Sequence, residues 1–139
     1  MGSEPGSARV IGAATPAFVD EVLDALDALW AESAHVASED RTLFTLAVSE
    51  VATNIVQHAE AFAHAEISVD VALRVAPDEL LATIVDTAHP ASIDWENVSM
   101  PDHESESGRG LAIATAALDE FEHSGGSAGN TWVLRRRLS

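Results

Sequence analysis

The chain has 139 residues, no cysteine and a formal net charge of −16, from 23 acidic residues against 7 basic residues that are all arginine. The length suits one domain with one hydrophobic core. The lack of cysteine excludes disulfides, thiolate metal sites and cysteine nucleophiles. The lack of lysine excludes a Walker A loop, which needs a lysine to bind phosphate. The negative charge argues against binding to nucleic acid or an anionic membrane. The sequence shows neither a signal peptide nor an apolar run of roughly 18 residues, so we expect a cytoplasmic protein.

The N-terminal part of the chain predicts one strand and one helix. Residues 1–7 are small, polar and turn-forming, which is typical of a disordered lead-in. A short strand is expected over residues 9–14. Thr15 and Pro16 then supply an N-cap hydroxyl and a proline suited to the first helical position, and apolar residues at helical spacing extend this helix to about Ala34.

A second helix is expected over residues 40–61, with Ser38 as its N-cap. Glu50, Asn54 and His58 recur within it at intervals of four, which places them along one polar stripe. An apolar stripe that would face the core lies beside it. A carboxylate and a carboxamide next to a buried face are typical of a site, although the same pattern also suits a solvated outer face.

The second half of the chain predicts strands interrupted by a loop and a helix. In order, these are strands over residues 65–75 and 80–86, a long acidic loop over 91–107, a helix over 108–118 and closing strands over 121–123 and 131–138. The first two strands are close enough to pair as a hairpin around Pro77 and Asp78. A structureless loop of this length is typical of a lid, a binding loop or a disordered segment. Grouped strands with helices on one face predict an α+β two-layer sandwich with a mainly antiparallel sheet.

Three polar features on different elements suit one ligand class. Glu50 and Asn54 offer a carboxylate and a carboxamide on one helix. Asp86 lies at a strand end, where a carboxylate can accept a hydrogen bond from the exocyclic amine of a base. The Gly-Arg-Gly-Leu run of residues 108–111 opens a helix, and the unpaired N–H groups and positive end of a helix favour phosphate. Together these features indicate a nucleotide pocket.

In this order and spacing, the features resemble the GHKL ATP-binding fold and, within it, the small anti-sigma-factor serine kinases of bacterial partner-switching systems. The ExxxN motif of the N box matches Glu50 and Asn54, and the phosphate box matches residues 106–111, Glu-Ser-Gly-Arg-Gly-Leu. The resemblance covers residues 9–138 and implies one ATP-binding kinase domain over residues 8–139.

The resemblance implies a role for each matched residue. Glu50 would act as the general base on a substrate serine hydroxyl, and Asn54 would ligate a Mg²⁺ ion that bridges the phosphates of ATP. Asp86 would receive the amino group of adenine. Backbone amides of one short run would hold phosphate: Gly108, Arg109, Gly110 and Leu111.

Two segments near the expected base site depart from the family pattern. The family has Asp-x-Gly where this chain has Asp-Thr-Ala from Asp86 to Ala88, so a methyl group stands where glycine would let the backbone approach the base. Near the C-terminus the family often has Gly-Thr, whereas this chain has Gly129-Asn130-Thr131. We therefore expect Ala88 at the base, and Asn130 or Thr131 as a polar contact near adenine.

The resemblance implies a Mg·ATP-dependent protein serine kinase that binds a sigma factor and phosphorylates a small STAS-type anti-sigma-factor antagonist. In such a switch the unphosphorylated antagonist captures the kinase and frees the sigma factor, and a homodimer is expected. The Asp-Thr-Ala departure leaves an alternative open, a partner-binding regulator on the same fold that binds nucleotide poorly and has no kinase activity. A histidine-kinase ATPase domain is less expected, because no phosphoacceptor helix precedes the fold in this sequence.

Other residues are expected to have ordinary structural roles. Trp30 fits the apolar stripe of the first helix and is expected in the core. The arginine run of residues 135–137 is expected to be the exposed end of the last strand, with docking to an acidic patch as the alternative. Five histidines show no paired metal spacing and are expected to be surface or hydrogen-bonded side chains: His35, His64, His89, His103 and His123.

Overall fold

The computed structural model describes residues 6–59, 66–89 and 106–138, and residues 106–109 by their backbone alone. The elements are β1 (Ser7–Ala13), α1 (Pro16–Ala31), α2 (Ser38–His58), β2 (Ser68–Val75), β3 (Glu79–Asp86), α3 (Glu106–Ala117), β4 (Glu120–Gly126) and β5 (Gly129–Arg137). This is the order of elements that the sequence predicts. Most of the expected lead-in and of the expected acidic loop lies outside the described residues.

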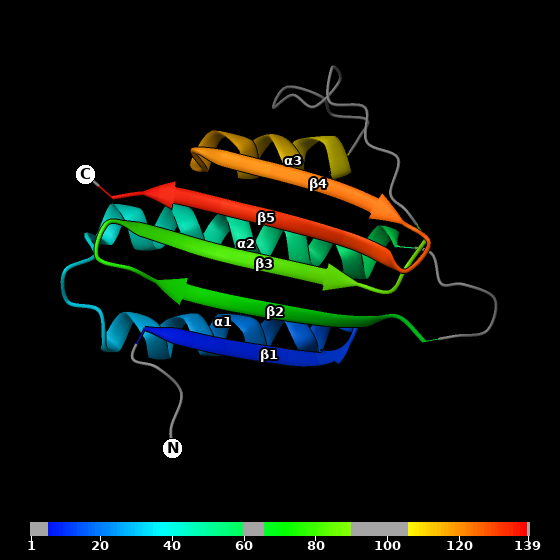
Figure 1. Cartoon of the computed structure of the whole chain (residues 1–139), viewed down its shortest axis with the longest axis horizontal. Coiled ribbons are helices and arrows are strands. Elements are labelled where there is room, and N and C mark those ends of the chain that lie inside the picture. The colour runs from blue at the N-terminus through cyan, green and yellow to red at the C-terminus, as the bar shows by residue number, and fades with distance from the viewer. Residues whose placement is uncertain (1–5, 60–65, 90–105, 139) are drawn as a thin grey trace.

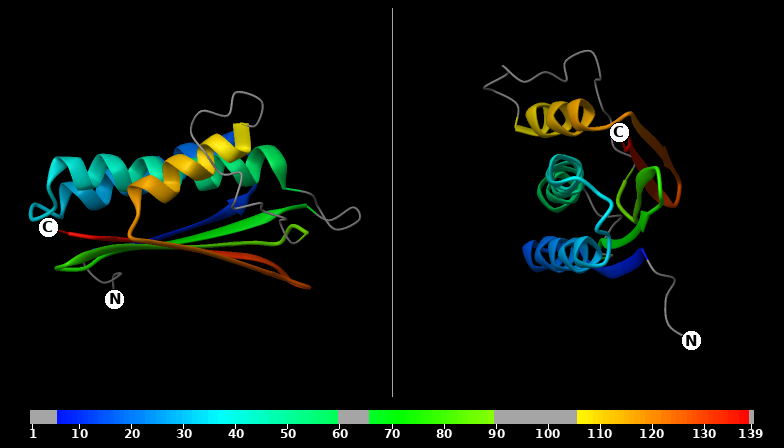
Figure 2. Two further views of the ribbon diagram at one scale, coloured as in Figure 1. Left: turned by 90° about the horizontal axis from the view of Figure 1, so that it is seen from above. Right: turned by 90° about the vertical axis from the view of Figure 1, so that its left-hand side faces the viewer.

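The strands form one antiparallel sheet in the order β1-β2-β3-β5-β4. Figure 1 shows the sheet in front of the helices, and Figure 2 shows that α1, α2 and α3 all cover the same face of it. The predicted α+β two-layer sandwich is therefore confirmed. No helix within the described ranges combines the length and the apolar character needed to cross a membrane.

The central strands bury alternate residues, because successive side chains of a strand point to opposite faces of the sheet. Val71 of β2 pairs with Ile84 of β3, which pairs with Trp132 of β5, and all three are fully buried. Asp86 follows Ile84 by two residues and therefore lies on the same helix-facing side. A carboxylate on the core side of a strand is uncommon, so the end of β3 is a place to look for a site.

Helix α1 begins as predicted. Thr15 is its N-cap, and the Thr15 hydroxyl accepts a hydrogen bond from the Phe18 amide at 3.3 Å, with Pro16 as the first helical residue. Trp30 near the other end is 8% exposed and donates from Nε1 to the Thr45 hydroxyl of α2 at 3.0 Å. The expected place of Trp30 in the core is confirmed.

The predicted end of α1 is wrong, because the helix stops at Ala31 rather than near Ala34. Arg41 of α2 reaches back to the connection between the two helices. Its Nε donates to the Val36 carbonyl and its Nη2 to the Ser33 carbonyl, each at 2.8 Å. These carbonyls find their donor outside the helix, so the chain can turn early. The partner lies in the next helix, where helical periodicity does not reveal it.

Other predicted boundaries also move. Ser38 is the first residue of α2 and not, as predicted, its N-cap. The N-cap of the helix is Ala37, whose side chain makes no capping hydrogen bond. Acidic residues in the first turn stabilise the positive end of α2 instead. The helix ends at His58, before the predicted residue 61. Strand β1 already begins at Ser7, since this residue pairs with β2.

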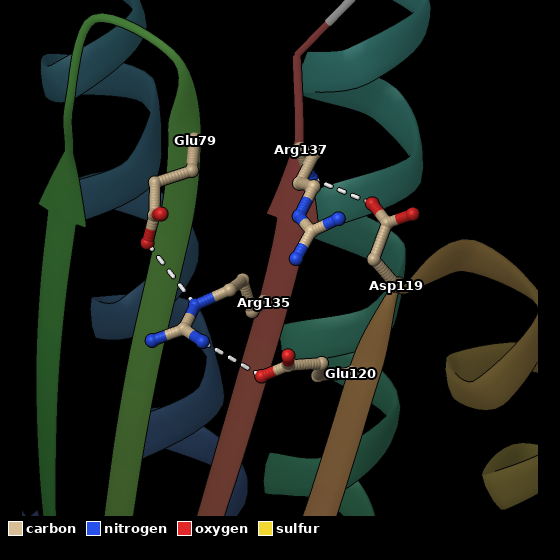
Figure 3. Close-up of polar contacts among 5 residues, drawn as sticks. All are labelled: Glu79, Asp119, Glu120, Arg135 and Arg137. Carbon is tan, nitrogen blue, oxygen red and sulfur yellow. Dashed lines mark hydrogen bonds and ion pairs between the residues drawn. The ribbon is translucent and has the colours of Figure 1, made fainter.

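The arginine run at the end of β5 is engaged in contacts within the chain. Arg135 lies between two carboxylates, with Nε 3.1 Å from Glu79 of β3 and Nη1 2.7 Å from Glu120 of β4 (Figure 3). The backbone amide of Arg137 donates to the Asp119 carboxylate at 2.6 Å. Two carboxylates of the same chain already face Arg135, which weakens the alternative of an acidic docking partner.

Arg136 points to the helices and joins three elements. Its Nε donates to Asp40 Oδ1 of α2 at 2.9 Å, and its Nη1 donates to the Ala117 carbonyl of α3 at 2.8 Å. Asp40 is 5% exposed. Removing one partner of a buried ion pair costs about 3–5 kcal/mol. This guanidinium therefore helps to fix α2 and α3 on the sheet.

Candidate functional site

Glu50 and Asn54 lie together on α2, beside the buried stripe that the sequence predicts. Ala47, Val51 and Ile55 of that stripe are at most 2% exposed, whereas Glu50 and Asn54 are half-buried. The Oδ1 atom of Asn54 is buried, and no hydrogen bond from the described residues reaches it. An unsatisfied buried polar atom costs about 1–3 kcal/mol, so this oxygen is a strong candidate for contact with a ligand.

Helix α3 brings Gly110 against Glu50. A Cβ atom built on Gly110 would lie 2.8 Å from Glu50 Oε2, closer than real Cβ atoms approach a neighbour. Glycine at this position therefore lets the backbone of α3 come up to the carboxylate. His58, the third member of the predicted polar stripe, is the exposed last residue of α2.

Helix α3 begins at Glu106, earlier than the predicted Gly108. The N–H groups that lack a partner within a helix belong to its first turn. Gly108 and Arg109 lie in that turn, whereas Gly110 and Leu111 follow it. Leu111 is 5% exposed and packs in the hydrophobic core. The amides available to an anion are therefore those before Gly110, and Gly110 and Leu111 have packing roles.

At the end of β3, the Asp86 carboxylate is 1% exposed and accepts three hydrogen bonds. Its Oδ1 accepts from the Ala88 amide at 3.0 Å and from Asn130 Nδ2 at 2.9 Å. Its Oδ2 accepts from Trp132 Nε1 at 3.1 Å. All three partners are donors, which is the arrangement that an ionised carboxylate requires.

Ala88 closes a short turn on this carboxylate and is 0% exposed. Its methyl group is packed within the protein. The Asp-Thr-Ala segment that departs from the family pattern therefore forms a compact turn in which the alanine side chain occupies space at the end of β3.

Asn130 and Thr131 lie on opposite faces of the sheet. Asn130 is 2% exposed, pairs with Asp86 in the ladder and contacts its carboxylate. Thr131 pairs with Val85, whose side chain is 41% exposed on the outer face. Of the two residues predicted near the base, Asn130 is thus the one that lies against Asp86.

Two members of this cluster, His123 and Trp132, were not predicted as site residues. The ring nitrogen His123 Nε2 lies 2.7 Å from Asn130 Oδ1, and the His123 ring is 4.3 Å from the Trp132 ring between centroids. A signal for Trp132 exists in the sequence, because it follows Asn130 by two residues and a buried indole N–H needs an acceptor. No local signal indicates His123, which reaches the cluster from the edge strand β4.

Gly129 makes this arrangement possible. It has φ +131°, and a Cβ atom built on it would lie 1.9 Å from the Asp86 carbonyl oxygen. Only glycine fits so close to another backbone in this conformation. The closing hairpin is also tighter than the predicted turn over residues 124–130, because Gly126 and Gly129 already pair with each other.

The two groups of residues lie at one end of the molecule. Figures 1 and 2 show the C-terminal ends of β3 and α2 and the first residues of β5 and α3 at this end. The helix layer contributes Glu50, Asn54 and Gly110, and the sheet contributes Asp86 and Asn130. A ligand with an anionic part and a part that donates hydrogen bonds suits such a pair of surfaces.

A family model described as a histidine kinase-like ATPase domain matches residues 12–136. The chain belongs to this family. The resemblance to the GHKL fold is thereby confirmed, and membership in a family of histidine kinase-like ATPase domains implies that ATP is the nucleotide. No curated protein sequence matches the chain.

Two solved structures show how this ATPase domain relates to larger proteins. The RsbU and RsbW domains of Rv1364c from Mycobacterium tuberculosis match with a TM-score of 0.64 and 24% identity, over 95% of this chain and 32% of that one. The histidine kinase domain of a blue-light activated histidine kinase from Erythrobacter litoralis EL346 matches with a TM-score of 0.55 and 21% identity, over 88% of this chain and 60% of that one. At these identities the likeness shows the fold alone, and this chain spans less than two thirds of either.

Proposed function

We propose that this ATPase-family domain is a Mg·ATP-dependent serine protein kinase that acts as an anti-sigma factor in a partner-switching system. One observation carries the proposal: α3 brings Gly110 against the Glu50 carboxylate, one helical turn from the unsatisfied Oδ1 of Asn54. A carboxylate, a carbonyl-type oxygen and the start of a helix thus converge at one end of the molecule. That combination suits phosphoryl transfer to a hydroxyl group.

Glu50 is proposed as the general base. Phosphoryl transfer depends mainly on positioning and on neutralising charge, and a nearby carboxylate can take the proton of the attacking hydroxyl. Glycine at position 110 brings the backbone of α3 up to the Glu50 carboxylate. A phosphate held at the first turn of α3 would therefore lie on the same side of α2 as the base.

Asn54 is proposed as the magnesium ligand. Its buried Oδ1 atom receives no hydrogen bond from the described residues, and amide oxygens are among the ligands that Mg²⁺ accepts. The residue therefore fits the ion. When bound, magnesium would supply charge neutralisation for the phosphates.

The remaining predicted residues are proposed to hold the nucleotide. The first turn of α3, with Gly108 and Arg109, would bind phosphate through its free amides. Asp86 would accept a hydrogen bond from the adenine amine. Ala88 would line the base, since it closes the turn on the Asp86 carboxylate.

The proposed partners follow from the family resemblance. They are a sigma factor, which the domain would hold inactive, and a STAS-type antagonist, which it would phosphorylate on serine. We also propose a cytoplasmic homodimer. The solved structure that contains an RsbW domain supports this reading through its fold, and a net charge of −16 suits a basic partner surface.

A second candidate function has an observation in its favour. The Asp86 carboxylate already accepts three hydrogen bonds, and the Ala88 methyl group is fully buried. The first feature leaves fewer acceptor positions for a nucleotide base, and the second leaves less space for it. They favour a regulator that binds its protein partners on this fold while binding nucleotide weakly.

Transfer of radiolabelled phosphate from ATP to a STAS-type antagonist tests the kinase proposal. We expect transfer by the wild type, and a loss of at least about a hundredfold in Glu50→Ala with ATP binding retained, because the proton acceptor is gone. Gln57→Ala, at an exposed position on the same helix, is the control and should transfer normally. Unchanged transfer in Glu50→Ala would exclude Glu50 as the base, and wild type that binds ATP but transfers nothing would favour the weak regulator.

A further inference from the structure

A chain of hydrogen-bonded side chains runs from the edge strand β4 to the end of β3. His123 Nε2 lies 2.7 Å from Asn130 Oδ1, and Asn130 Nδ2 lies 2.9 Å from Asp86 Oδ1. Trp132 Nε1 donates to the other carboxylate oxygen at 3.1 Å. Asp86, Asn130 and Trp132 are each at most 2% exposed. A buried network in which the members satisfy one another holds its side chains in one orientation.

The hydrogen bonds of this chain have one direction. Asn130 Nδ2 faces two acceptors, Asp86 Oδ1 and the His89 carbonyl, each at 2.9 Å. A flipped amide would place its oxygen against both, so the nitrogen must point to them and the oxygen to His123. His123 Nε2 must then carry a hydrogen and donate it. Asp86 and the His89 carbonyl therefore fix which end of the Asn130 amide meets Asp86, and the bond from His123 holds the amide oxygen on its other side.

Asp86 is left with one open acceptor position. A carboxylate has about four lone-pair sites, and the partners of Asp86 use two on Oδ1 and one on Oδ2. The open site belongs to Oδ2. An N–H donor is accepted there, whereas a carbonyl oxygen would meet a buried anion and be repelled. Sites that present buried polar groups reject analogues that leave those groups unpaired.

We propose that Asn130 and His123 are positioning residues that determine nucleobase specificity. By holding the Asp86 carboxylate with one acceptor open, they select a 6-aminopurine nucleotide over a 6-oxopurine nucleotide. The inference rests on the proposed function, because it requires a nucleotide at this end of the molecule. It goes beyond that function because it assigns specificity to two residues that need not touch the base.

The surroundings of His123 allow a clean substitution. His123 is half-buried on the edge strand β4, so a change of its side chain is less disruptive than a change in the core. His123→Gln keeps an amide N–H within reach of Asn130 Oδ1, whereas His123→Leu removes the donor. Glu122→Gln alters the neighbouring exposed residue of β4 and serves as the control.

Calorimetric titration of the full chain with ATP and with ITP, a 6-oxopurine nucleotide, in the presence of Mg²⁺ tests the proposal. We expect the wild type to prefer ATP at least about tenfold, because ITP sets a carbonyl oxygen against Asp86. His123→Leu and Asn130→Leu should lower the ratio of ATP affinity to ITP affinity at least about threefold, because they weaken the binding of ATP. His123→Gln and Glu122→Gln should keep it. A purely structural role would weaken both nucleotides alike and leave the ratio unchanged.

The possible outcomes separate the two proposals. If ATP binds and both His123→Leu and Asn130→Leu keep the wild-type ratio of ATP affinity to ITP affinity, the positioning role is wrong and the proposal of ATP binding stands. Tighter ATP binding in Asn130→Leu also contradicts it, since the carboxamide would then compete with the base. A lower ratio in His123→Gln contradicts the donor role of the imidazole. If the wild type binds neither nucleotide, the proposed function and this inference fail together.

Discussion

The helix side and the sheet side of the candidate site differ in how their polar groups are satisfied. On the helix side, the buried Oδ1 of Asn54 receives no hydrogen bond from the described residues, and Gly110 lets the backbone of α3 approach the Glu50 carboxylate. On the sheet side, Asp86 already accepts three hydrogen bonds, and its neighbour Asn130 is bonded on both ends of its amide. A ligand therefore completes the first side but adds to a network on the second.

Under the proposed function, this difference gives the two sides of the site different roles. Phosphate and magnesium would satisfy groups that the protein leaves open, which favours affinity. The base would meet a carboxylate with one open acceptor, which favours selectivity over affinity. Changes on the helix side should then alter binding strength and phosphate transfer, and changes on the sheet side should alter stability and the choice of base.

The largest effect is expected at Gly129 on the sheet side. Gly129→Ala places a Cβ atom 1.9 Å from the Asp86 carbonyl oxygen at φ +131°. We expect the free energy of unfolding to fall by about 2–4 kcal/mol, because backbone must move and alanine disfavours this conformation. Urea denaturation measures the change.

Gly126→Ala in the same hairpin is the matched control, since a Cβ atom there meets nothing within 4 Å. It should change stability by less than about 0.5 kcal/mol. Equal stability of the two variants would contradict the tight approach of β5 to the end of β3.

A smaller effect is expected at Gly110 on the helix side. In Gly110→Ala the new Cβ atom would lie 2.8 Å from Glu50 Oε2, and the end of that flexible side chain can move away. We expect stability to change by less than about 1 kcal/mol, because glycine in a helix interior is itself unfavourable by roughly that amount. Phosphate transfer should fall about tenfold, because the base is displaced.

The combination of thermal denaturation and phosphate transfer measures this effect. Gly110→Ala with normal stability and normal transfer would show that the Glu50 carboxylate need not stay against α3. A large loss of stability would show that Glu50 is fixed more firmly than a flexible side chain should be.

The smallest effect is expected at Ala88. Removing its buried methyl group in Ala88→Gly gives the backbone at the end of β3 more freedom to approach a base. We expect ATP affinity to rise about two- to fivefold and stability to fall by about 1 kcal/mol, as is usual when a buried methyl group is lost. Calorimetry measures the affinity, and weaker binding in this variant would contradict the view that the methyl group restricts the base side.

The fold was largely predictable because its elements carry local patterns. Period-two alternation identified β2, the turn at Pro77 and Asp78 placed β3 after it, and Thr15 with Pro16 identified the start of α1. The wrong predictions mainly concern the ends of helices, which depend on contacts as well as on the local sequence pattern. Arg41 shapes the end of α1 through carbonyls in the connection, and Ser38 does not cap α2.

The candidate site was predictable on the helix side and only partly so on the sheet side. Glu50 and Asn54 lie on one helix, so their spacing alone places them on one stripe. The surroundings of Asp86 depend on strand pairing, which brings Asn130 beside it and turns Thr131 to the outer face. His123 joins from the edge strand through a contact that no sequence spacing encodes.

Titration of the wild type with ATP, with and without Mg²⁺, tests the central claim most directly. We expect ATP to bind, more tightly with Mg²⁺ than without it, and we expect Asn54→Ala to lose this dependence on the ion because its amide oxygen is the proposed ligand. Gln57→Ala on the same helix should keep the dependence. No binding heat at millimolar ATP with Mg²⁺, or a dependence on Mg²⁺ that Asn54→Ala retains in full, would contradict the account.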